Sequence, residues 1–529
     1  MKRGPHPTSF TGIVLLALAA GTLGCSPRAQ AGPLDLSFYY DVNLRREDQV
    51  RVLEPIWRRA AAAGYKKVML SDAHFPRLDA MDDQYRANAA RVRELGHQLG
   101  LEIVPMVFAV GRSNMMLGRD PNLAEGIPVR NALFVVQGGE ARLVADPPVS
   151  LATQPEWADP GVRTAAGIAT TPSAAGRGRF RFTLRVSPFR CYHASVRVRS
   201  RAFQGKAQLD AKGDAQDLDY NDPLDIQPTQ EWKTYDLVFN SLDHDQVTVW
   251  MGLWKGVAGD LDWTDWRIEE VGLLNVLRRP GAPCVVDGFV EGRDYQLIRD
   301  SALDAANGTG DYSAWHQPPV IHTRLPDGTR LRVSWYQPFL MFDGVASCCP
   351  SDSGTIALLR DEAGRMKEMW GARGYLLGHD EIRCLNWDPA CAAQGRDAGP
   401  VLAEHMRRCL RLLAGAQAYV WSDMFDPLHN AHANYYMVRG DLKGSWEGLD
   451  TSVVIVNWDS KHRGESLRFF SQLGHRQVIA GYYDGDLAGV KDWLDAARGV
   501  PGVVGVMYTS WRHRYDDLER FAELVRSGR

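Results

Sequence analysis

The sequence lacks the features that mark several large classes of protein. Its 529 residues carry a net charge of -3, which gives no electrostatic case for binding nucleic acid or an anionic membrane surface. No CxxC pair or histidine-rich cluster has zinc spacing, so the sequence predicts no catalytic metal. The N-terminal apolar run, residues 12–23, is too short to span a bilayer. The remaining composition, 45% hydrophobic and 24% charged, is that of a globular protein.

The N-terminus has the order of a secretory signal: two basic residues, the apolar run, and then Leu23-Gly24-Cys25. This last segment resembles a bacterial lipobox, which implies removal of residues 1–24 and lipidation of Cys25. Plain cleavage after Ala29 or Ala31 is the alternative. We therefore expect an exported chain, periplasmic or at the cell surface, with a lipid anchor to the membrane through Cys25.

Cysteine is scarce, and seven residues of this type follow Cys25. An odd number leaves at least one of them free or intermolecular. In an oxidising compartment, Cys384 and Cys391 are candidates for a disulfide. Tryptophan is abundant by contrast, with 16 residues. Its rings suit stacking on sugars, although they also fill cores.

Length alone favours more than one domain, and strands alternate with helical segments at both ends of the chain. This alternation predicts an α/β fold of the (β/α)8 TIM-barrel type. The candidate strands are 34–41, 67–72, 101–108, 331–336, 374–381, 418–423, 452–458, 477–483 and 503–511. They are one too many for such a barrel, so either 331–336 or 34–41 is an elaboration. If the last strand, 503–511, is the eighth of the barrel, the strand at 374–381 is the fourth.

The middle of the chain has a different periodicity. From about residue 144 to 273 the segments are short, alternate in polarity and are separated by turn residues, as at 179–186, 194–200 and 246–252. This pattern predicts an antiparallel β-sandwich inserted into the barrel. The expected division is a signal peptide (1–24), the first part of the barrel (25–143), the inserted sandwich (144–275) and the rest of the barrel (276–529).

Two segments of the insert carry a family resemblance. Residues 231–239, followed by 262–271, resemble the last strands of a CenC-type carbohydrate-binding jelly roll. The resemblance implies a glycan-binding face, and a structural calcium ion is common in that family. Trp250, Trp254 and Trp263 form a stacking platform for sugars or, alternatively, fill the core of the sandwich.

Aromatic, acidic and amide side chains stand together at the ends of the barrel strands. Because the carboxyl ends of parallel barrel strands face one rim, these side chains predict a shared site there. Aromatic rings beside carboxylates suit a pyranose, which stacks through its C–H face and hydrogen-bonds through its hydroxyls. The predicted substrate-binding residues are Asp72, His74, Trp335, His379, Trp421, Asp423, Asn457, Trp458, Tyr482, Tyr508 and Trp511.

Asp380 and Glu381 are the candidate catalytic pair. Two adjacent carboxylates repel each other, so the pKa of one should rise, and a protonated carboxylic acid is what glycosidic cleavage requires. Neighbouring strand residues point opposite ways, so the turn after Gly378 must re-aim one of the two. The alternative is an ordinary solvated turn at the end of the strand.

Leu376-Leu-Gly-His-Asp-Glu381 resembles the His-x-Gly-Gly-Asp-Glu motif of family 20 hexosaminidases. The resemblance implies that Glu381 is the general acid/base and that Asp380 orients the substrate's own 2-acetamido group, the nucleophile. It also implies that Tyr482 or Tyr508 donates to the acetamido oxygen. In the same comparison, three tryptophans form the wall around the sugar: Trp421, Trp458 and Trp511.

Three functions follow from these observations. The first is an exported glycoside hydrolase that acts on β-linked 2-acetamido sugars with retention of configuration. The second is a hydrolase of another polysaccharide, with Glu381 as the acid and Asp423, Asp459 or Asp484 as a separate nucleophile. The third is a non-catalytic, surface-anchored lipoprotein that binds an oligo- or polysaccharide.

Overall fold

The computed structural model describes residues 34–528 apart from 150–153, 214–217, 308–311, 341–343, 394 and 485. The expected signal peptide and Cys25 lie outside the described residues, so export and lipidation stay predictions. Among the helices in the described ranges, none has the length and apolarity needed to cross a bilayer.

Within the described residues, eight parallel strands close into the predicted barrel. In order they are β1 (Asp35–Asp41), β2 (Lys67–Ser71), β3 (Glu102–Val107), β17 (Gly374–Leu377), β19 (Gln417–Trp421), β21 (Val454–Asn457), β22 (Arg476–Ile479) and β23 (Val503–Tyr508). Pairing of β1 with β23 closes the ring. The strand that precedes the acid pair, β17, is the fourth, as the sequence predicts.

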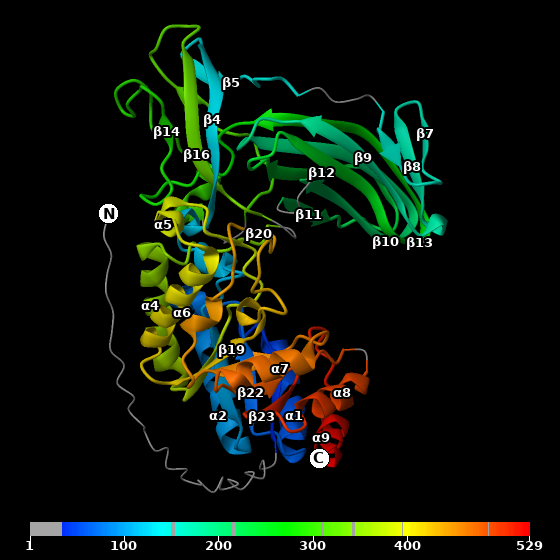
Figure 1. Ribbon diagram of the computed structural model, residues 1–529, viewed down its shortest axis with the longest axis vertical. Helices are drawn as coiled ribbons and strands as arrows, with labels where there is room; N and C mark the ends of the chain where they lie inside the picture. Colours follow the sequence, from blue (N-terminus) through cyan, green and yellow to red (C-terminus); the bar gives the residue numbers. More distant parts are fainter. Residues whose placement is uncertain are drawn as a thin grey trace, which may run out of the picture.

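Helices cover the outside of this barrel (Figure 1). The α-helices of the described residues are α1 (Glu47–Ala62), α2 (Asp83–Leu99), α3 (Asn114–Leu117), α4 (Ser353–Trp370), α5 (Pro389–Ala392), α6 (Ala398–Leu412), α7 (Arg463–Gln472), α8 (Ala488–Ala497) and α9 (Leu518–Ser527). Local chemistry sets their ends. In α2, the Asp82 side chain accepts the Tyr85 N–H at the start, and Gly100 takes a left-handed conformation at the end.

A five-stranded antiparallel sheet stands beside the barrel, in the order β14-β16-β4-β5-β15. Its strands are β4 (Gly126–Gln137), β5 (Glu140–Leu143), β14 (Val285–Val286), β15 (Ile321–His322) and β16 (Arg330–Pro338). The predicted strand 331–336 is therefore the elaboration, because it pairs with β4 and not with a barrel strand. The expected boundaries 25–143 and 276–529 also assigned β4, β5 and β14–β16 to the barrel, which does not contain them.

The predicted insert forms an eight-stranded antiparallel sheet. Its strands are β6 (Trp157–Ala158), β7 (Arg163–Ala165), β8 (Ile168–Pro172), β9 (Gly178–Arg185), β10 (Cys191–Lys212), β11 (Asp219–Pro223), β12 (Gln230–Asn240) and β13 (Gln246–Val271). The two antiparallel sheets lie at one end of the molecule and the barrel with its helices at the other (Figure 1). A two-layer sandwich stays a prediction, because continuous pairing joins these strands into one curled sheet. The short strands β18 (Cys384–Leu385) and β20 (Met437–Val438) form a separate pair.

Strand alternation divides the barrel side chains into two layers. Tyr39, Met69, Leu376 and Trp421 belong to the cluster inside the barrel, and their immediate neighbours pack outward against the helices. This alternation is the ordinary period of two of a β-strand. It decides which residues at each strand end reach the pocket described next.

Candidate active site

A pocket of about 830 Å³ opens at the carboxyl ends of the barrel strands. This rim is where barrel enzymes place their active sites. Among the predicted residues, the pocket is lined by Asp72, Asp380, Glu381, Trp421, Trp458, Tyr482 and Trp511. Tyr39, Asp41 and Arg112 also line it, although they are not among the predicted substrate-binding residues. The structure thus brings the candidate catalytic pair and most of the predicted aromatic residues to one place.

Asp380 points into the pocket because it continues the inward alternation of Leu376 in β17 and of Gly378 just after it. Burial raises the pKa of its carboxyl, and the negative charges of Asp423 and Glu381 raise it further, against a smaller opposing effect of Arg112. Its pKa rises to about 7, so of the two members of the pair Asp380 is the one that keeps its proton closer to neutral pH.

Glu381 is the charged member of the pair. Partial burial raises its pKa, but the positive charges of Arg383 and Arg112 outweigh this and hold the pKa below its ordinary value. Its Oε2 lies 2.7 Å from Arg383 and 2.9 Å from Arg112. The protonation of the pair is thus the reverse of what the resemblance to family 20 implies, which made Glu381 the acid.

The backbone of Glu381 explains how two adjacent residues reach one pocket. Its φ of +50° lies in the left-handed region, which re-aims a side chain that alternation would send outward. Asp423 holds this conformation, because its Oδ2 accepts the Glu381 N–H at 2.8 Å. The same carboxylate accepts from Asn430 at 3.0 Å and from Trp458 Nε1 at 3.4 Å. Burial raises the pKa of Asp423, and these donors oppose the rise.

Aromatic rings form one wall of the pocket. The ring centroid of Tyr39 lies 5.0 Å from that of Trp511 and 5.9 Å from that of Trp421. Trp511 is 52% exposed and Tyr482 is 57% exposed, so both present open faces, whereas Trp421 is buried. Exposed aromatic faces beside carboxyl groups are suited to a sugar ring.

Three predicted ligands point away from the pocket because they stand at outward strand positions. His379 is buried next to His405 of α6. Tyr508 packs outside the barrel and donates through its hydroxyl to the Arg514 carbonyl at 2.8 Å. Asn457 is likewise fully buried and does not line the pocket.

The Asp72 carboxylate is occupied by hydrogen bonds within the protein, so few of its lone pairs remain for a ligand. It accepts from the Leu44 N–H, the Tyr85 hydroxyl and His74, whose Nδ1 lies 2.7 Å away. His74 is therefore occupied with Asp72 and does not line the pocket.

Two of the alternative nucleophiles, Asp459 and Asp484, are occupied by hydrogen bonds from residues of the rim loops. Asp459 accepts from His462 and from the Lys461 N–H. Asp484 accepts from the Ser510 hydroxyl and the Trp511 N–H. In both, burial raises the pKa, but these hydrogen bonds hold it below its ordinary value. Asp423 is the one of the three that interacts with the acid pair.

The prediction that Trp335 lies at the barrel rim is wrong, because this residue is fully buried in the core of the five-stranded sheet. In the eight-stranded sheet, Trp263 is also core, and its Nε1 donates to Thr171 at 3.0 Å. Trp250 and Trp254 are only partly buried.

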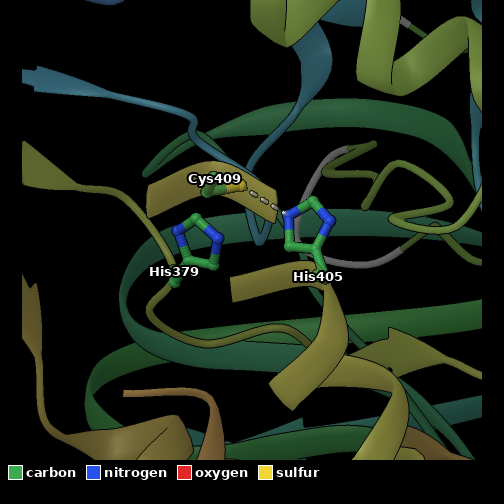
Figure 2. A group of neighbouring side chains, drawn as sticks. All are labelled: His379, His405 and Cys409. Carbon is green, nitrogen blue, oxygen red and sulfur yellow. Dashed lines mark hydrogen bonds between the residues drawn. The ribbon is translucent and has the colours of Figure 1, made fainter. Parts of the chain in front are cut away.

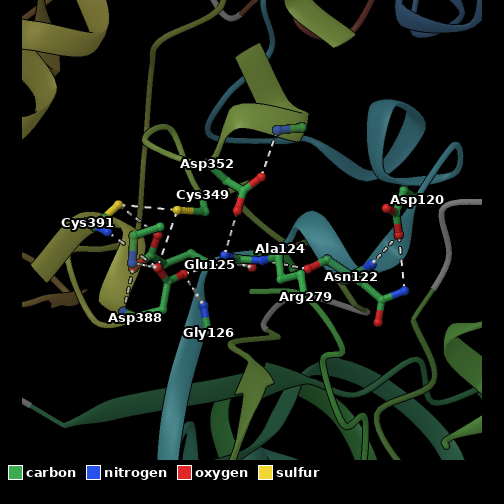
Figure 3. Close-up of polar contacts among 12 residues, drawn as sticks. Asp120, Asn122, Ala124, Glu125, Gly126, Arg279, Cys349, Asp352, Asp388 and Cys391 are labelled. Atoms are coloured by element: carbon green, nitrogen blue, oxygen red, sulfur yellow. Dashed lines mark hydrogen bonds and ion pairs between the residues drawn. The ribbon is translucent and has the colours of Figure 1, made fainter. Parts of the chain in front are cut away.

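Two groups of described residues have the chemistry to bind a metal: His379, His405 and Cys409, and Glu125, Cys349, Asp388 and Cys391. The second group is shown in Figure 3. There, the Cys391 sulfur lies 3.3 Å from that of Cys349, so Cys391 faces Cys349 and not the expected Cys384. The described cysteines are all free thiols, and Cys348 and Cys349 are both fully buried.

No family model and no curated protein sequence matches the chain. Among solved structures, a rhamnosidase from Novosphingobium sp. PP1Y is similar over 93% of this chain and 58% of its own, with 12% identity and a TM-score of 0.34. The chain thus spans little more than half the length of that rhamnosidase.

Several other similar structures are carbohydrate-binding modules that match only part of the chain. A CBM4 structure covers 21% of this chain and 77% of its own, with 13% identity and a TM-score of 0.18. The module CBM6cm-2 from Cellvibrio mixtus lichenase 5A, in complex with cellotriose, covers 22% of this chain and 88% of its own, with 14% identity and a TM-score of 0.16. At these TM-scores, the function has to be argued from the chain's own side chains.

Proposed function

We propose that this chain is a glycoside hydrolase whose barrel-rim pocket cleaves O-glycosidic bonds, with Asp380 as proton donor and Glu381 as its ionised partner. One observation carries the proposal: two adjacent carboxyl groups in one aromatic-lined pocket have pKa values displaced in opposite directions. Such a displacement is the physical basis on which glycosidases assign one acid and one anion.

The reaction follows from the two charge states. Asp380 protonates the glycosidic oxygen as the bond to the leaving group breaks, which removes the need to expel an alkoxide. Positive charge then develops at the anomeric carbon, and the Glu381 carboxylate stabilises it. The two arginines keep Glu381 charged, while burial and the charge of Asp423 keep Asp380 protonated.

For the substrate, we propose a pyranoside that stacks on Trp511 and Tyr482, the two exposed rings of the pocket. The nucleophile is either a group of the protein or the 2-acetamido group of the substrate. A panel of aryl β-glycosides with and without the 2-acetamido group distinguishes them. Turnover confined to the acetamido members supports substrate-assisted catalysis; turnover of plain glycosides assigns the step to Glu381 or to water that it activates. The anomeric configuration of the first product, followed by NMR, separates these last two.

The test of the proposal is to assay the wild type beside Asp380→Asn and Glu381→Gln on natural oligosaccharides as well as the aryl panel. Each substitution should reduce kcat by about 10²–10⁴-fold. Asp380→Asn should be least harmful with aryl leaving groups of low pKa, since these need no proton.

Asp459→Asn is the matched control, because Asp459 is a nearby carboxylate tied to its own loop. It should keep close to wild-type activity. If both pocket variants keep full activity, or if folded wild type binds glycans and turns none of them over, the enzyme proposal fails and a glycan-binding role replaces it.

A second function is favoured by the eight-stranded sheet, and we propose that it binds glycans. Trp157 and Trp250 lie with ring centroids 5.4 Å apart, and the Arg179 guanidinium stands over Trp250 at 5.2 Å and over Trp254 at 6.0 Å. Partly exposed indoles beside a hydrogen-bond donor can stack on and bond to a sugar. Trp250→Ala should weaken polysaccharide binding and leave hydrolysis of small aryl glycosides unchanged; equal binding by the variant would contradict this role.

A further inference from the structure

Three metal-ligating side chains meet behind the acid-bearing strand: His379, His405 and Cys409 (Figure 2). All three are buried, and one ligand atom from each lies within 4.8 Å of the others. His405 and Cys409 are four residues apart in α6 and so share one face of that helix. His379 reaches them from the end of β17, because its outward position faces α6.

His405 is oriented as a metal ligand would be. Its Nδ1 lies 2.8 Å from the Pro350 carbonyl oxygen, and a carbonyl only accepts, so this nitrogen must carry the proton. The neutral ring therefore has its lone pair on Nε2, which accepts from the Cys409 thiol at 3.3 Å and can ligate a metal once the thiol loses its proton. Fixing one imidazole nitrogen by a backbone carbonyl so that the other can ligate is the usual outer-shell arrangement of metal-binding histidines.

His379 supplies an independent observation. It is fully buried, and neither of its ring nitrogens has a hydrogen-bond partner among the described residues. A neutral imidazole has one N–H donor and one acceptor nitrogen, and buried polar groups without partners are rare and need an explanation. Its ring centroid lies 5.2 Å from that of His405, so the space that the two rings face is the one beside Cys409.

We propose that His379, His405 and Cys409 bind a zinc ion, with a water molecule as the fourth ligand. Two imidazole nitrogens and a thiolate suit Zn²⁺. In a tetrahedral site with Zn–S and Zn–N bonds of about 2.3 and 2.0 Å, nitrogen and sulfur ligands stand about 3.5 Å apart, close to the 3.3 Å between His405 and Cys409. Binding releases the thiol proton of Cys409 to solvent, and the ion enters as the chain folds, because the site is enclosed.

In the cluster of Glu125, Cys349, Asp388 and Cys391 every member already has a polar partner, whereas His379 of the first cluster has none among the described residues (Figure 3). The Cys391 sulfur lies 3.3 Å from Glu125 Oε2, and Asp388 Oδ2 lies 2.5 Å from Arg279. These contacts account for the cluster without an ion, which makes it the natural comparison for the first one.

The decisive experiment uses the full wild-type chain, folded in the presence of Zn²⁺ and then desalted. Metal analysis should find one zinc per chain. Zinc K-edge X-ray absorption should show one sulfur and two imidazole neighbours. Retention of no zinc would overturn the proposal, and so would a site with two sulfurs and no imidazole, which would place the metal between Cys349 and Cys391.

Two cysteine variants provide the second test. Cys409→Ser should lose the bound zinc and the rise in Tm that Zn²⁺ gives the wild type, whereas Cys391→Ser, a matched buried thiol, should keep both. Equal zinc retention by the two variants would overturn the assignment. If Cys409→Ser fails to fold, the absorption spectrum of the wild type still decides.

Discussion

Replacing Arg383 with methionine should move the acidic limb of the pH–rate profile to higher pH. Arg383 lies 2.7 Å from Glu381 Oε2, with only 9% of its side chain exposed. Its charge contributes more to the lowered pKa of Glu381 than that of Arg112. Methionine keeps most of the side-chain volume and removes the charge.

The size of the shift can be worked out from the exposure of the two partners. Glu381 is 27% exposed, and a hydrogen bond between charged groups in such a setting contributes about 1.5–3 kcal/mol. Since about 1.36 kcal/mol corresponds to one pKa unit, the pKa of Glu381 should rise by about one to two units. A carboxylate with a lowered pKa loses its charge as pH falls through that value. The midpoint of the acidic limb should therefore move to higher pH by the same amount.

Arg112 provides a matched comparison, because it contacts the same oxygen at 2.9 Å but is 59% exposed. Solvent screening limits such a pair to about 0–1 kcal/mol, so Arg112→Met should move the limb by less than about one unit. The assay is kcat/KM against pH for the wild type and both variants, with Tm as the check on folding. A folded Arg383→Met enzyme with an unmoved limb, or a larger shift in Arg112→Met, would refute the reasoning.

Four further outcomes follow from the site. Asp423→Asn removes a negative charge that raises the pKa of Asp380, so the alkaline limb should move to lower pH. Trp511→Ala should raise KM about tenfold, the effect of losing about 1.4 kcal/mol of stacking, and leave Tm nearly unchanged because the ring is exposed. Asp380→Asn should raise Tm at pH 8, since a carboxyl with a raised pKa costs stability as pH rises through that value. Asp484→Asn should lower Tm, because the pKa of Asp484 is lowered instead.

Each outcome has a result that would contradict it. An alkaline limb that moves upward in Asp423→Asn would mean that Asp423 does not set the protonation of Asp380. An unchanged KM in Trp511→Ala would place the sugar elsewhere in the pocket. Thermal melts of Asp380→Asn and Asp484→Asn at pH 4 and pH 8 check the last pair: a drop in Tm at pH 8 for Asp380→Asn, or no drop for Asp484→Asn, would contradict the assigned charge states.

The barrel could be predicted because each of its strands is locally encoded by an apolar run that ends in polar residues. The extra strand could not be identified in the same way. The segment 331–336 leaves the barrel because it pairs with β4, whose residues lie about two hundred positions earlier. That pairing is absent from the local pattern of either segment, since antiparallel partners are selected by the assembled fold.

The site residues divide along the alternation of the strands. Inward positions such as Trp421 and Trp458 line the pocket, while outward positions such as Tyr508 and Asn457 do not. Counting in twos from a known inward residue of each strand would have separated them. Arg112 carries no such local signal, because it follows β3 and reaches Glu381 only through the fold.

Which member of the candidate catalytic pair is charged depends on residues that are distant in the sequence. Adjacency alone predicts that one pKa must rise, without saying which. Arg383 is close in sequence but the second cation, Arg112, is 269 positions away, and the anion that acts on Asp380 comes from the next strand, in Asp423. The pair is thus visible in the sequence, and its assignment is visible only in the structure.

The left-handed backbone of Glu381 ties this chemistry to the fifth strand. A non-glycine residue at a φ of +50° is held there at a cost in free energy of about 1 kcal/mol or more, and glycine in its place would lack the carboxylate. The hydrogen bond from the Glu381 N–H to Asp423 opposes that cost. The same Asp423 raises the pKa of Asp380. One carboxylate at the end of β19 therefore both positions the anion and keeps the acid protonated, so the geometry and the charge state of the pair depend on the same residue.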